Sequence, residues 1–600
     1  MNRYLVLWAS LLKLSWKQRP GFLTLFLFCQ VLDIAALAFT GLALRDAIDA
    51  AQRGVLASSI IAATTAAVCY AATSVLRGVA QTLRLQAIER IGVAELDTLI
   101  MRYIVGVEGI EHLERPQFLD RITVLRGAGW GVMDSTWGVV EAVLSTVRLA
   151  VLLLLLNTVD PWLLTLLPFA AVPLWLDKRG QGAVAKAEVA TAEAMRLQKH
   201  LFTLLTTAGP GKELRITSAG GELARRQTAA WDEAVEARFR AQLASAGWKL
   251  CGWVIFMLGY AAALAFVVRQ ALTAGGSAGD IVLTVTVATT LRSAVQQTVS
   301  RSAEVASYKR LLDPFLWLRD YVAREKAARP VTGVPVPRRI EKGIAFDRVS
   351  YMYPGTKHPA VDEVTIDLPA GSVVAVVGEY GSGKTTLVKL LCKYYRPDEG
   401  KITVDGNDLT SLNAADWWER LSVAFQDFGR YRTTFGEAVG LGDLPNKDDS
   451  DRILAALRAA DAEHLPSRLV NGLRTQLGKE FGGTDLSEGQ WQKTALARAS
   501  MREAPVMVVL DEPTASLDAP SEQTVFETYM RNARDLAQKT GAVTVVVSHR
   551  FSTVAGADLI LVMRRGRLVE HGSHEELMAL GGSYAELYSI QEKAYSLPQS

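Results

Sequence analysis

The amino-terminal half of the sequence contains six long apolar segments, which limit the possible folds of the chain more than any other feature. They cover residues 21–44, 55–76, 132–156, 161–176, 250–268 and 279–297. A helix needs roughly 20 mostly apolar residues to cross the hydrocarbon layer of a bilayer, so each segment predicts a membrane-spanning helix. The fourth segment is short and carries two prolines, and the sixth is rich in polar residues, so the ends of these two are the least sharply defined.

The connections between these segments predict how the chain is oriented in the membrane. About 55 residues follow the second segment and about 70 follow the fourth, whereas the other connections are short. The first long connection contains seven arginines and the amino-terminal segment is also basic, so the positive-inside tendency places this side in the cytoplasm. Six spans then leave the amino terminus and the whole carboxy-terminal half in the cytoplasm. From the amino-terminal residues we expect no cleavable signal peptide.

A change of composition divides the chain near residue 325. Residues 326–342 contain Pro330, Pro335 and Pro337 and are typical of a linker. After it, short Val- and Ile-rich runs alternate with charged helical stretches. The sequence therefore predicts an all-α membrane domain over residues 1–325 and an α/β domain over residues 343–600.

Charge and cysteine usage exclude several classes of protein. The chain carries 65 Lys+Arg against 62 Asp+Glu, and this formal charge of +3 gives no argument for a nucleic-acid partner. Its four cysteines lie far apart, so neither a zinc site nor a disulfide scaffold is expected.

The run VVAVVGEYGSGKTTLVKLL, residues 373–391, predicts a buried strand, a glycine-rich turn and a helix. Its spacing, with Gly378 followed after four residues by Gly383, Lys384 and Thr385, is that of a phosphate-binding P-loop. The glycines let backbone N–H groups surround phosphates, Lys384 reaches the β and γ phosphates, and the Thr385 hydroxyl can ligate Mg²⁺. The residues expected to bind the nucleotide here are Gly378, Glu379, Tyr380, Gly381, Ser382, Gly383, Lys384, Thr385 and Thr386.

A second apolar strand, in VMVVLDEPTASLD at residues 506–518, ends in Asp511 and Glu512. Two adjacent acids at the end of a buried strand are costly unless a cation lies near. Asp511 is expected to complete the Mg²⁺ shell together with Thr385, and Glu512 to polarise a water for in-line attack on the γ-phosphate. The sequence therefore predicts an ATPase that uses ATP and Mg²⁺.

Between these two elements lies LSEGQ, residues 486–490, which resembles the signature of ATP-binding cassette (ABC) proteins. By this resemblance, Ser487, Gly489 and Gln490 bind the nucleotide held by a second chain. The resemblance assigns adenine stacking to Tyr353 and γ-phosphate contact to the catalytic residue His549. It gives Gln426 a catalytic role as the residue that senses Mg²⁺ and the membrane domain.

Ser516, Leu517 and Asp518 match the loop that crosses the dimer interface in that family.

Six spans followed by one such ATPase domain are the layout of half-size ABC exporters, and the resemblance implies how such a chain works. Two ATPase domains face each other, so the working unit is a dimer of two copies or of this chain and a paralogous half-transporter. ATP binding closes the domains and hydrolysis reopens them. Residues 111–120 and 211–226 resemble the coupling helices that transmit closure to the membrane domain.

Glu488 departs from the family pattern, in which glycine is the most frequent residue at this place. A carboxylate beside Ser487 and Gly489 adds repulsion toward a γ-phosphate unless it points to solvent. Because Glu512 and His549 are both present, we expect ATP hydrolysis to survive this substitution.

Ionisable residues within the apolar segments indicate a substrate path or interhelical pairing. Asp33 lies in the first segment, and Glu141 and Arg148 share one face of the third. The last segment presents a set of polar residues: Thr284, Thr286, Thr289, Thr290, Arg292, Gln296 and Gln297. Both a hydrated cavity for an amphipathic cargo and pairing between helices remain open at this point.

The stretch from Leu477 to Pro505, with AFQDFGRY, resembles the exporters of lanthipeptide-type peptides. A peptide or other amphipathic substrate is therefore expected to leave the cell through the cytoplasmic membrane. The frequent use of Ala, Arg and Gly favours a bacterial source. The alternative is a lipid or multidrug exporter; an ATP-gated channel or receptor and a non-transport ABC ATPase are further hypotheses.

Overall fold

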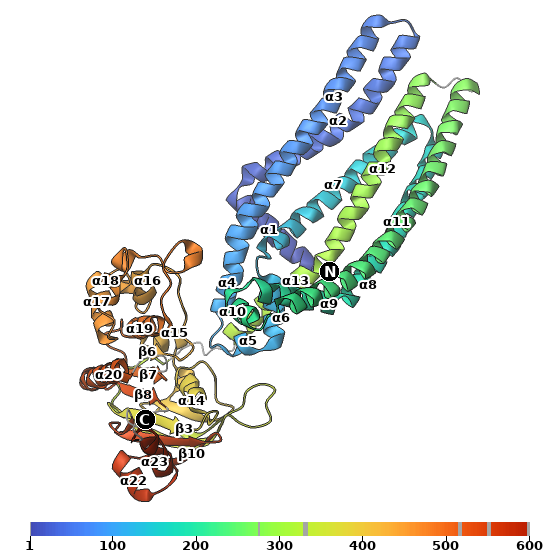
Figure 1. Ribbon diagram of the computed structural model, residues 1–600. Coiled ribbons are helices and arrows are strands. Elements are labelled where there is room, and N and C mark those ends of the chain that lie inside the picture. The colour runs from blue at the N-terminus through green and yellow to red at the C-terminus, as the bar shows by residue number, and fades with distance from the viewer. Residues whose placement is uncertain (1, 274–276, 328–333, 514–518, 549–553, 597–600) are drawn as a thin grey trace. The chain divides into compact units, whose positions relative to one another are not determined.

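The computed structural model describes residues 2–273, 277–327, 334–513, 519–548 and 554–596, and the chain forms two compact units (Figure 1). The first, here called the helical unit, consists of Met1–Ile104 and Arg121–Arg319. The second, here called the α/β unit, consists of Val105–Asp120 and Asp320–Ser600. A short stretch of the first long connection thus belongs to the same unit as the carboxy-terminal half.

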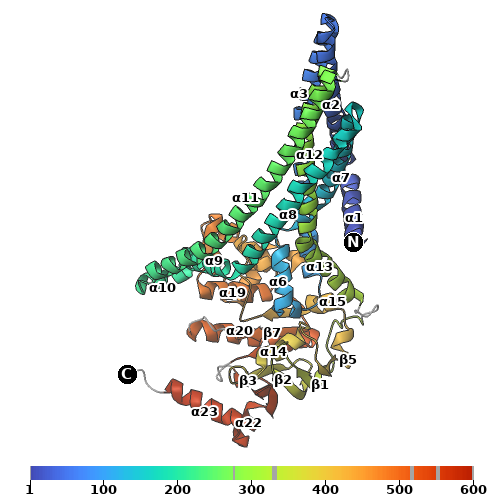
Figure 2. The same cartoon turned by 90° about the vertical axis from the view of Figure 1, so that its right-hand side faces the viewer.

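Long helices that run side by side build the helical unit (Figure 2). In chain order the elements are α1 (Asn2–Gln18), α2 (Pro20–Gln52), α3 (Leu56–Ala87), the π-helix η1 (Ile88–Asp97), α4 (Thr98–Val105), α5 (Glu111–Glu114), α6 (Pro116–Leu125), α7 (Gly129–Val159), the 3-10 helix η2 (Pro161–Thr165), α8 (Leu166–Ala190), α9 (Ala192–Thr206), α10 (Ala208–Ile216), α11 (Gly220–Thr273), α12 (Ala278–Ser307) and α13 (Lys309–Ala327). Of these, the last residue of α4, all of α5, the start of α6 and the end of α13 lie in the α/β unit.

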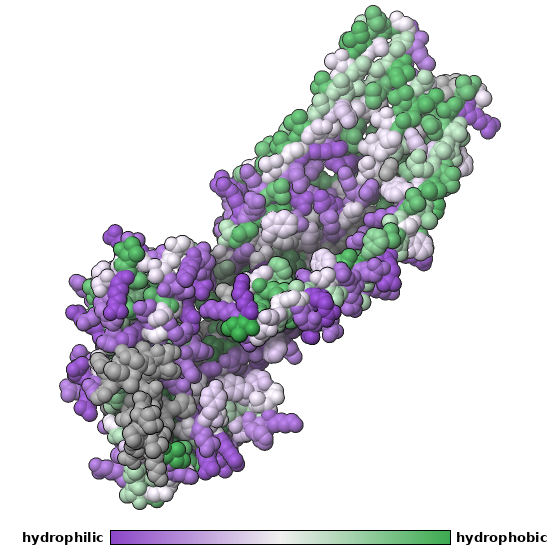
Figure 3. Space-filling view, viewed as in Figure 1, coloured by the Kyte–Doolittle hydropathy of each residue, from purple (hydrophilic) through white to green (hydrophobic). Residues whose placement is uncertain are grey.

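Five helical stretches among the described residues are long and apolar enough to cross a membrane. They are Pro20–Gln52, Leu56–Val105, Gly129–Val159, Gly220–Gln270 and Ala278–Thr298. Large apolar side chains on these helices are exposed, for example Phe28 at 61% and Leu258 at 66%. Figure 3 shows hydrophobic side chains over the outer ends of the long helices. Such a surface is suited to contact with lipid, because exposing an apolar patch of this extent to water is unfavourable.

The fourth predicted segment, residues 161–176, forms η2 and the beginning of α8, and it is not among these five helices. Asp160 caps η2, since its carboxylate accepts a hydrogen bond from the Trp162 backbone N–H at 2.8 Å. The charged run Asp177, Lys178, Arg179 follows directly after the segment and shortens its apolar stretch.

Helix α8 packs closely against α11 through small residues. A Cβ atom on Gly252 of α11 would lie 2.6 Å from the Cα atom of Pro173, and one on Gly259 would lie 2.5 Å from the Phe169 ring. On α8, a Cβ atom on Gly180 would lie 2.6 Å from the Ser245 hydroxyl. Small residues that let two backbones approach are a common means of helix association in membranes.

The α/β unit contains two sheets. Its strands are β1 (Gly343–Tyr351), β2 (Val361–Pro369), β3 (Val373–Gly378), β4 (Glu399–Val404), β5 (Asn407–Asp408), β6 (Leu421–Ala424), β7 (Met507–Asp511), β8 (Val543–Val547), β9 (Leu559–Arg564) and β10 (Arg567–Gly572). The smaller sheet has the order β2-β1-β4-β5, and the larger has the order β10-β9-β3-β8-β7-β6. In the larger sheet, only β10 pairs antiparallel among the described strands.

Both faces of the larger sheet are covered, which explains the continuous apolar runs of β7 and β8. Its helices are α14 (Lys384–Leu391), α15 (Ala414–Glu419), α16 (Phe435–Gly440), α17 (Ser450–Ala459), α18 (Leu465–Arg468), α19 (Glu488–Ala499), α20 (Ala519–Thr540), α22 (His574–Leu580) and α23 (Ser583–Ser596). Helix α14 shares one core with residues of both sheets, and its Leu387 and Leu391 are fully buried there. The start of α14, and with it the P-loop, is therefore held rigidly.

Candidate functional site

The P-loop connects β3 to α14 through a turn that requires glycine. Gly378 has φ +148°, Gly381 has +75° and Gly383 has +104°, a region that L side chains rarely adopt. A Cβ atom on Gly378 would lie 2.1 Å from the Met563 carbonyl oxygen. The loop therefore keeps its backbone N–H groups free of side chains at the amino end of a helix, where phosphate binds favourably.

Lys384 and Ser382 supply the polar side chains of this loop. The Lys384 ammonium donates hydrogen bonds to the carbonyl oxygens of Gly378 at 2.9 Å and Glu379 at 2.8 Å, so it folds over the turn. Burial lowers the pKa of Lys384, and the nearby carboxylates of Glu512 and Asp511 oppose this shift. The Ser382 hydroxyl is buried and has no hydrogen-bond partner among the described residues. Both groups are suited to a bound phosphate.

Asp511 and Glu512 lie at the carboxyl end of β7, which β8 separates from β3. Burial, and next the charge of Glu512, raise the pKa of Asp511 to about 6, while a hydrogen bond with Thr385 opposes the shift. The Oδ1 atom of Asp511 is buried without a partner in the part of the chain that the structure describes. Glu512 has φ +49°, an uncommon conformation for a non-glycine residue and one that redirects the chain after the strand.

These residues fit Mg²⁺ and a nucleotide. Mg²⁺ prefers a few carboxylate or hydroxyl oxygens and completes its shell with water and phosphate oxygens. Asp511 and Thr385 would provide such oxygens, and a bound cation would favour the ionised form of Asp511. Within the described residues no group of three or more His, Cys, Asp or Glu could hold a metal ion by itself.

Tyr353 lies next to the P-loop helix. Its hydroxyl is 3.2 Å from the Thr386 hydroxyl, and its ring meets those of Tyr351 and Tyr395 edge-on, with centroids 5.2 and 5.5 Å away. The ring is partly exposed. Tyr353 is therefore placed beside the loop that would hold the phosphates, as an adenine-stacking residue requires.

Gln426 follows β6, the edge strand next to β7, and is exposed. The next residue, Asp427, is close enough for its charge to raise the pKa of Asp511. The loop after β6 thus lies on the same side of the sheet as Asp511, while the Gln426 side chain remains accessible.

The signature residues begin helix α19. The Ser487 hydroxyl accepts a hydrogen bond from the Gln490 N–H at 3.3 Å, and the Gln490 side chain accepts one from the Ser487 N–H at 2.9 Å, which forms a capping box. Leu486 and Trp491 pack in a second core, separate from the core around the P-loop helix. Ser487 and Glu488 are exposed, so this helix end is accessible to another molecule.

Several predicted residues cannot be placed. His549 and the interface loop Ser516, Leu517 and Asp518 lie outside the described residues. Sequence reasoning in turn missed Arg430, whose guanidinium contacts both carboxylate oxygens of Glu488, at 2.6 and 2.7 Å. No spacing pattern connects two residues so far apart in the chain.

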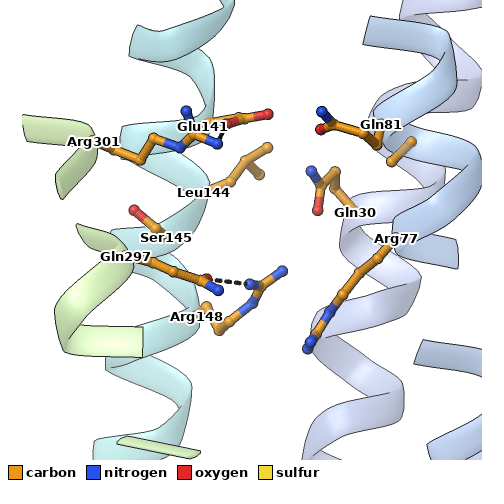
Figure 4. A pocket seen from close by; sticks show the side chains of 10 residues that line it. Gln30, Arg77, Gln81, Glu141, Leu144, Ser145, Arg148, Gln297 and Arg301 are labelled. Atoms are coloured by element: carbon orange, nitrogen blue, oxygen red, sulfur yellow. Dashed lines mark hydrogen bonds and ion pairs between the residues drawn. The ribbon is translucent and has the colours of Figure 1, made fainter. Parts of the chain in front are cut away.

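The helical unit contains a polar cavity of about 190 Å³ between α2, α3, α7 and α12. Figure 4 shows Gln30, Arg77 and Gln81 on one side, and Glu141, Arg148, Gln297 and Arg301 on the other. The buried Asp33 carboxylate pairs with Arg77 at 2.9 Å and Arg148 at 2.5 Å. The predicted ionisable residues Asp33, Glu141 and Arg148 thus gather at one place.

The polar residues of α12 divide between the two roles left open by the sequence. Gln297 lines the cavity and accepts a hydrogen bond from Arg148 at 3.1 Å. The hydroxyls of Thr284, Thr289 and Thr290 instead donate to backbone carbonyls of their own helix. The Arg292 side chain is not among those described.

Comparisons with known proteins agree with these two units. Residues 361–515 match the ABC transporter family, so this part of the chain is an ABC transporter ATPase domain, a domain that binds ATP. Over its length the chain has the fold of a half-size ABC exporter: it resembles a bacterial Atm1-family ABC exporter solved with ATP bound, with a TM-score of 0.78 at 20% identity, covering 95% of this chain and 99% of that one.

Curated relatives match smaller parts. An ATP-dependent lipid A-core flippase of Methylobacillus flagellatus is 37% identical over 42% of this chain and 42% of that protein. One of Xanthomonas campestris pv. campestris is 33% identical over 56% of this chain and 55% of that protein. ABC transporter B family member 13 of Arabidopsis thaliana is 31% identical over 72% of this chain and 34% of that protein. The chain thus spans between a third and little more than half of the length of these relatives.

Proposed function

We propose that this chain is one half of an ATP-driven exporter in the cytoplasmic membrane of a bacterium. Residues 1–325 would form its transmembrane domain, residues 326–342 its linker and residues 343–600 its ATP-binding domain in the cytoplasm. The observation that carries the proposal is the P-loop with Asp511 and Glu512 at one edge of a sheet, in a chain that also has helices long and apolar enough to cross a membrane.

Each residue of the site would have a separate role in ATP hydrolysis. Lys384 and the loop N–H groups would stabilise charge on the β and γ phosphates, and Tyr353 would stack on adenine. Thr385, Asp511 and Gln426 would hold Mg²⁺, which neutralises phosphate charge when bound. Glu512 would accept a proton from the attacking water, and His549 would contact the γ-phosphate.

The complete site would need a second chain. Ser487 and Gly489 lie at an exposed helix end whose core is separate from that of the P-loop helix. We propose that they contact ATP held by a second copy of this chain, or by a paralogous half-transporter. Closure of the two domains around ATP would then change the membrane domain through residues 111–120 and 211–226.

An amphipathic lipid with an anionic headgroup fits the cavity better than the peptide suggested by the sequence resemblance. Asp33 carries one charge and faces two guanidinium groups, and the Arg77 side chain is 45% exposed. Guanidinium groups bind carboxylate and phosphate oxygens well. Two of the relatives named above are, by their names, flippases of lipid A-core, and none of these relatives supports peptide export.

Purified chain reconstituted in lipid vesicles tests this proposal. We expect ATP hydrolysis that Glu512→Gln reduces by about 100-fold or more, while ATP binding remains. Uphill, ATP-dependent movement of an anionic lipid, reduced by Arg148→Gln but not by Arg196→Gln outside the cavity, would support lipid export. Stimulation of ATP hydrolysis by a leader-type peptide, and not by the lipid, would favour peptide export. ATP hydrolysis without net transport of either substrate would favour an ATP-gated channel or receptor.

A further inference from the structure

Glu488 is the first residue of α19 and lies between Ser487 and Gly489, the two residues proposed to meet ATP on a second chain. Its carboxylate forms an ion pair with Arg430. One nitrogen of the Arg430 guanidinium donates to both of its oxygens, at 2.6 and 2.7 Å. The Glu488 charge is thus matched by a cation from the loop after β6.

Stability of the single chain does not explain this ion pair. Its side chains are 46% and 54% exposed, and exposed pairs contribute little to folding free energy because water screens them. Covering this helix end with a second chain and its nucleotide would remove that water. The repulsion between a carboxylate and a triphosphate would then be much stronger.

The backbone around Arg430 is fixed by contacts to the other end of α19. Arg498 donates a hydrogen bond to the Gly429 carbonyl at 3.1 Å, and its guanidinium lies 4.1 Å from the centroid of the Tyr431 ring. On the other side, Arg432 pairs with Glu480. Because both neighbours of Arg430 are held, its guanidinium is directed toward Glu488 at little further cost in chain entropy.

We propose that Arg430 is a positioning residue for ATP binding. Its guanidinium neutralises Glu488 and thereby lets Ser487 and Gly489 approach the γ-phosphate. The inference rests on the proposed ATPase function. It explains how this chain keeps a carboxylate where glycine is usual and still binds a polyanion. Arg430 acts through Glu488 and the local charge rather than through the reacting atoms.

Four full-length proteins in lipid nanodiscs test the inference: wild type, Arg430→Ala, Glu488→Gln and the double variant. We expect Arg430→Ala to raise the KM for ATP about tenfold, because an unmatched carboxylate then faces the phosphates, with kcat changed much less. Glu488→Gln keeps the shape and removes the charge, so its KM should stay within about twofold of wild type. The double variant should return to the same range.

Arg432→Ala is the matched control, because it breaks a neighbouring exposed ion pair away from the signature and should leave KM unchanged. The inference is overturned if the double variant stays as impaired as Arg430→Ala, or if Glu488→Gln or Arg432→Ala raises KM as much, since the pair would then only hold the loop. It also fails if Arg430→Ala has the KM of wild type. Loss of the proposed function looks different: wild type would then hydrolyse no more ATP than Glu512→Gln.

Discussion

At the end of β7 the carboxyl group of Asp511 is 1% exposed and close to Glu512, and its pKa is raised to about 6. A carboxyl whose pKa is higher in the folded protein favours folding in its protonated form. The nucleotide-free protein therefore loses this contribution to stability as the pH rises from about 4 to about 6. A cation that binds the ionised carboxylate offsets the cost.

Mg²⁺-dependent ATP affinity should accordingly fall as the pH is lowered through about 6, by up to roughly tenfold per pH unit, because Asp511 must lose its proton to bind the metal. Titration with a fluorescent ATP analogue, with and without Mg²⁺, measures this. Asp511→Asn should bind weakly with a flatter profile, and its profile corrects for titration of the nucleotide itself. Equal pH slopes for the two proteins would contradict the assignment.

At the scale of elements, the segment Val105–Asp120 is attached to the rest of the α/β unit by several contacts. The Ile110 N–H donates to the Tyr394 carbonyl at 3.3 Å, and Glu108 pairs with the buried Lys393 at 3.3 Å. Phe118 is 3% exposed and meets the Tyr321 ring at 5.6 Å. This segment, which includes residues 111–120 predicted to be a coupling helix, is thus held by charge, backbone and aromatic contacts.

Phe118→Ala should lower the free energy of unfolding by about 3–5 kcal/mol, since it removes a buried ring. It should also reduce the transport obtained per ATP hydrolysed. Thermal unfolding and the ratio of the two rates in vesicles measure these effects. Leu119→Ala is the matched control, because that side chain is 44% exposed. Identical behaviour of the two variants would show that Phe118 is not an anchor.

The contact of α8 with α11 gives a second prediction at this scale. Gly252→Ala places a methyl group 2.6 Å from the Cα atom of Pro173, and a backbone atom cannot rotate away. We expect the midpoint of thermal unfolding in detergent to fall by several degrees, as for overpacked sites in general. Gly247→Ala, with no atom within 4 Å of the added carbon, should be neutral or slightly stabilising. A fall of equal size in both variants would contradict the steric explanation, because helix propensity favours alanine over glycine at both positions.

For the whole molecule, the proposed site divides Lys384 and Ser487 between two chains. Lys384→Ala and Ser487→Ala homodimers should each be inactive. A heterodimer of the two, purified through different tags on its chains, contains one site with both residues intact, so it should bind one ATP tightly and recover up to about half of the wild-type ATPase rate. If each chain formed its own site, the heterodimer would recover nothing.

Local patterns were sufficient for the parts of the fold that depend on neighbouring residues. The P-loop glycines and the acids at the end of β7 follow from spacings of a few residues. Five of the membrane helices could be predicted equally well from their apolar lengths. Residues 161–176 were harder to predict, because prolines interrupt them and a charged run follows directly.

The remaining features depend on contacts between distant segments. Arg430 and Glu488 lie on different elements, as do Asp33 and its two arginines, and no periodicity connects them. The hydroxyls of the α12 threonines could have faced a cavity or their own helix, and only the packed structure distinguishes these cases. Side-chain pairing across a fold is set by tertiary geometry, which the order of residues encodes only indirectly.

The attachment of Val105–Asp120 to the α/β unit has a consequence for biosynthesis. When the ribosome has made this loop, Lys393 and Tyr394, which contact Glu108 and Ile110, are still nearly 300 residues from being synthesised. Glu108 therefore has no Lys393 to pair with while the later membrane spans are synthesised. The loop reaches these contacts only after that part of the carboxy-terminal half has been made. An interruption of translation or a deletion in the carboxy-terminal half would leave this loop exposed to proteases and quality control.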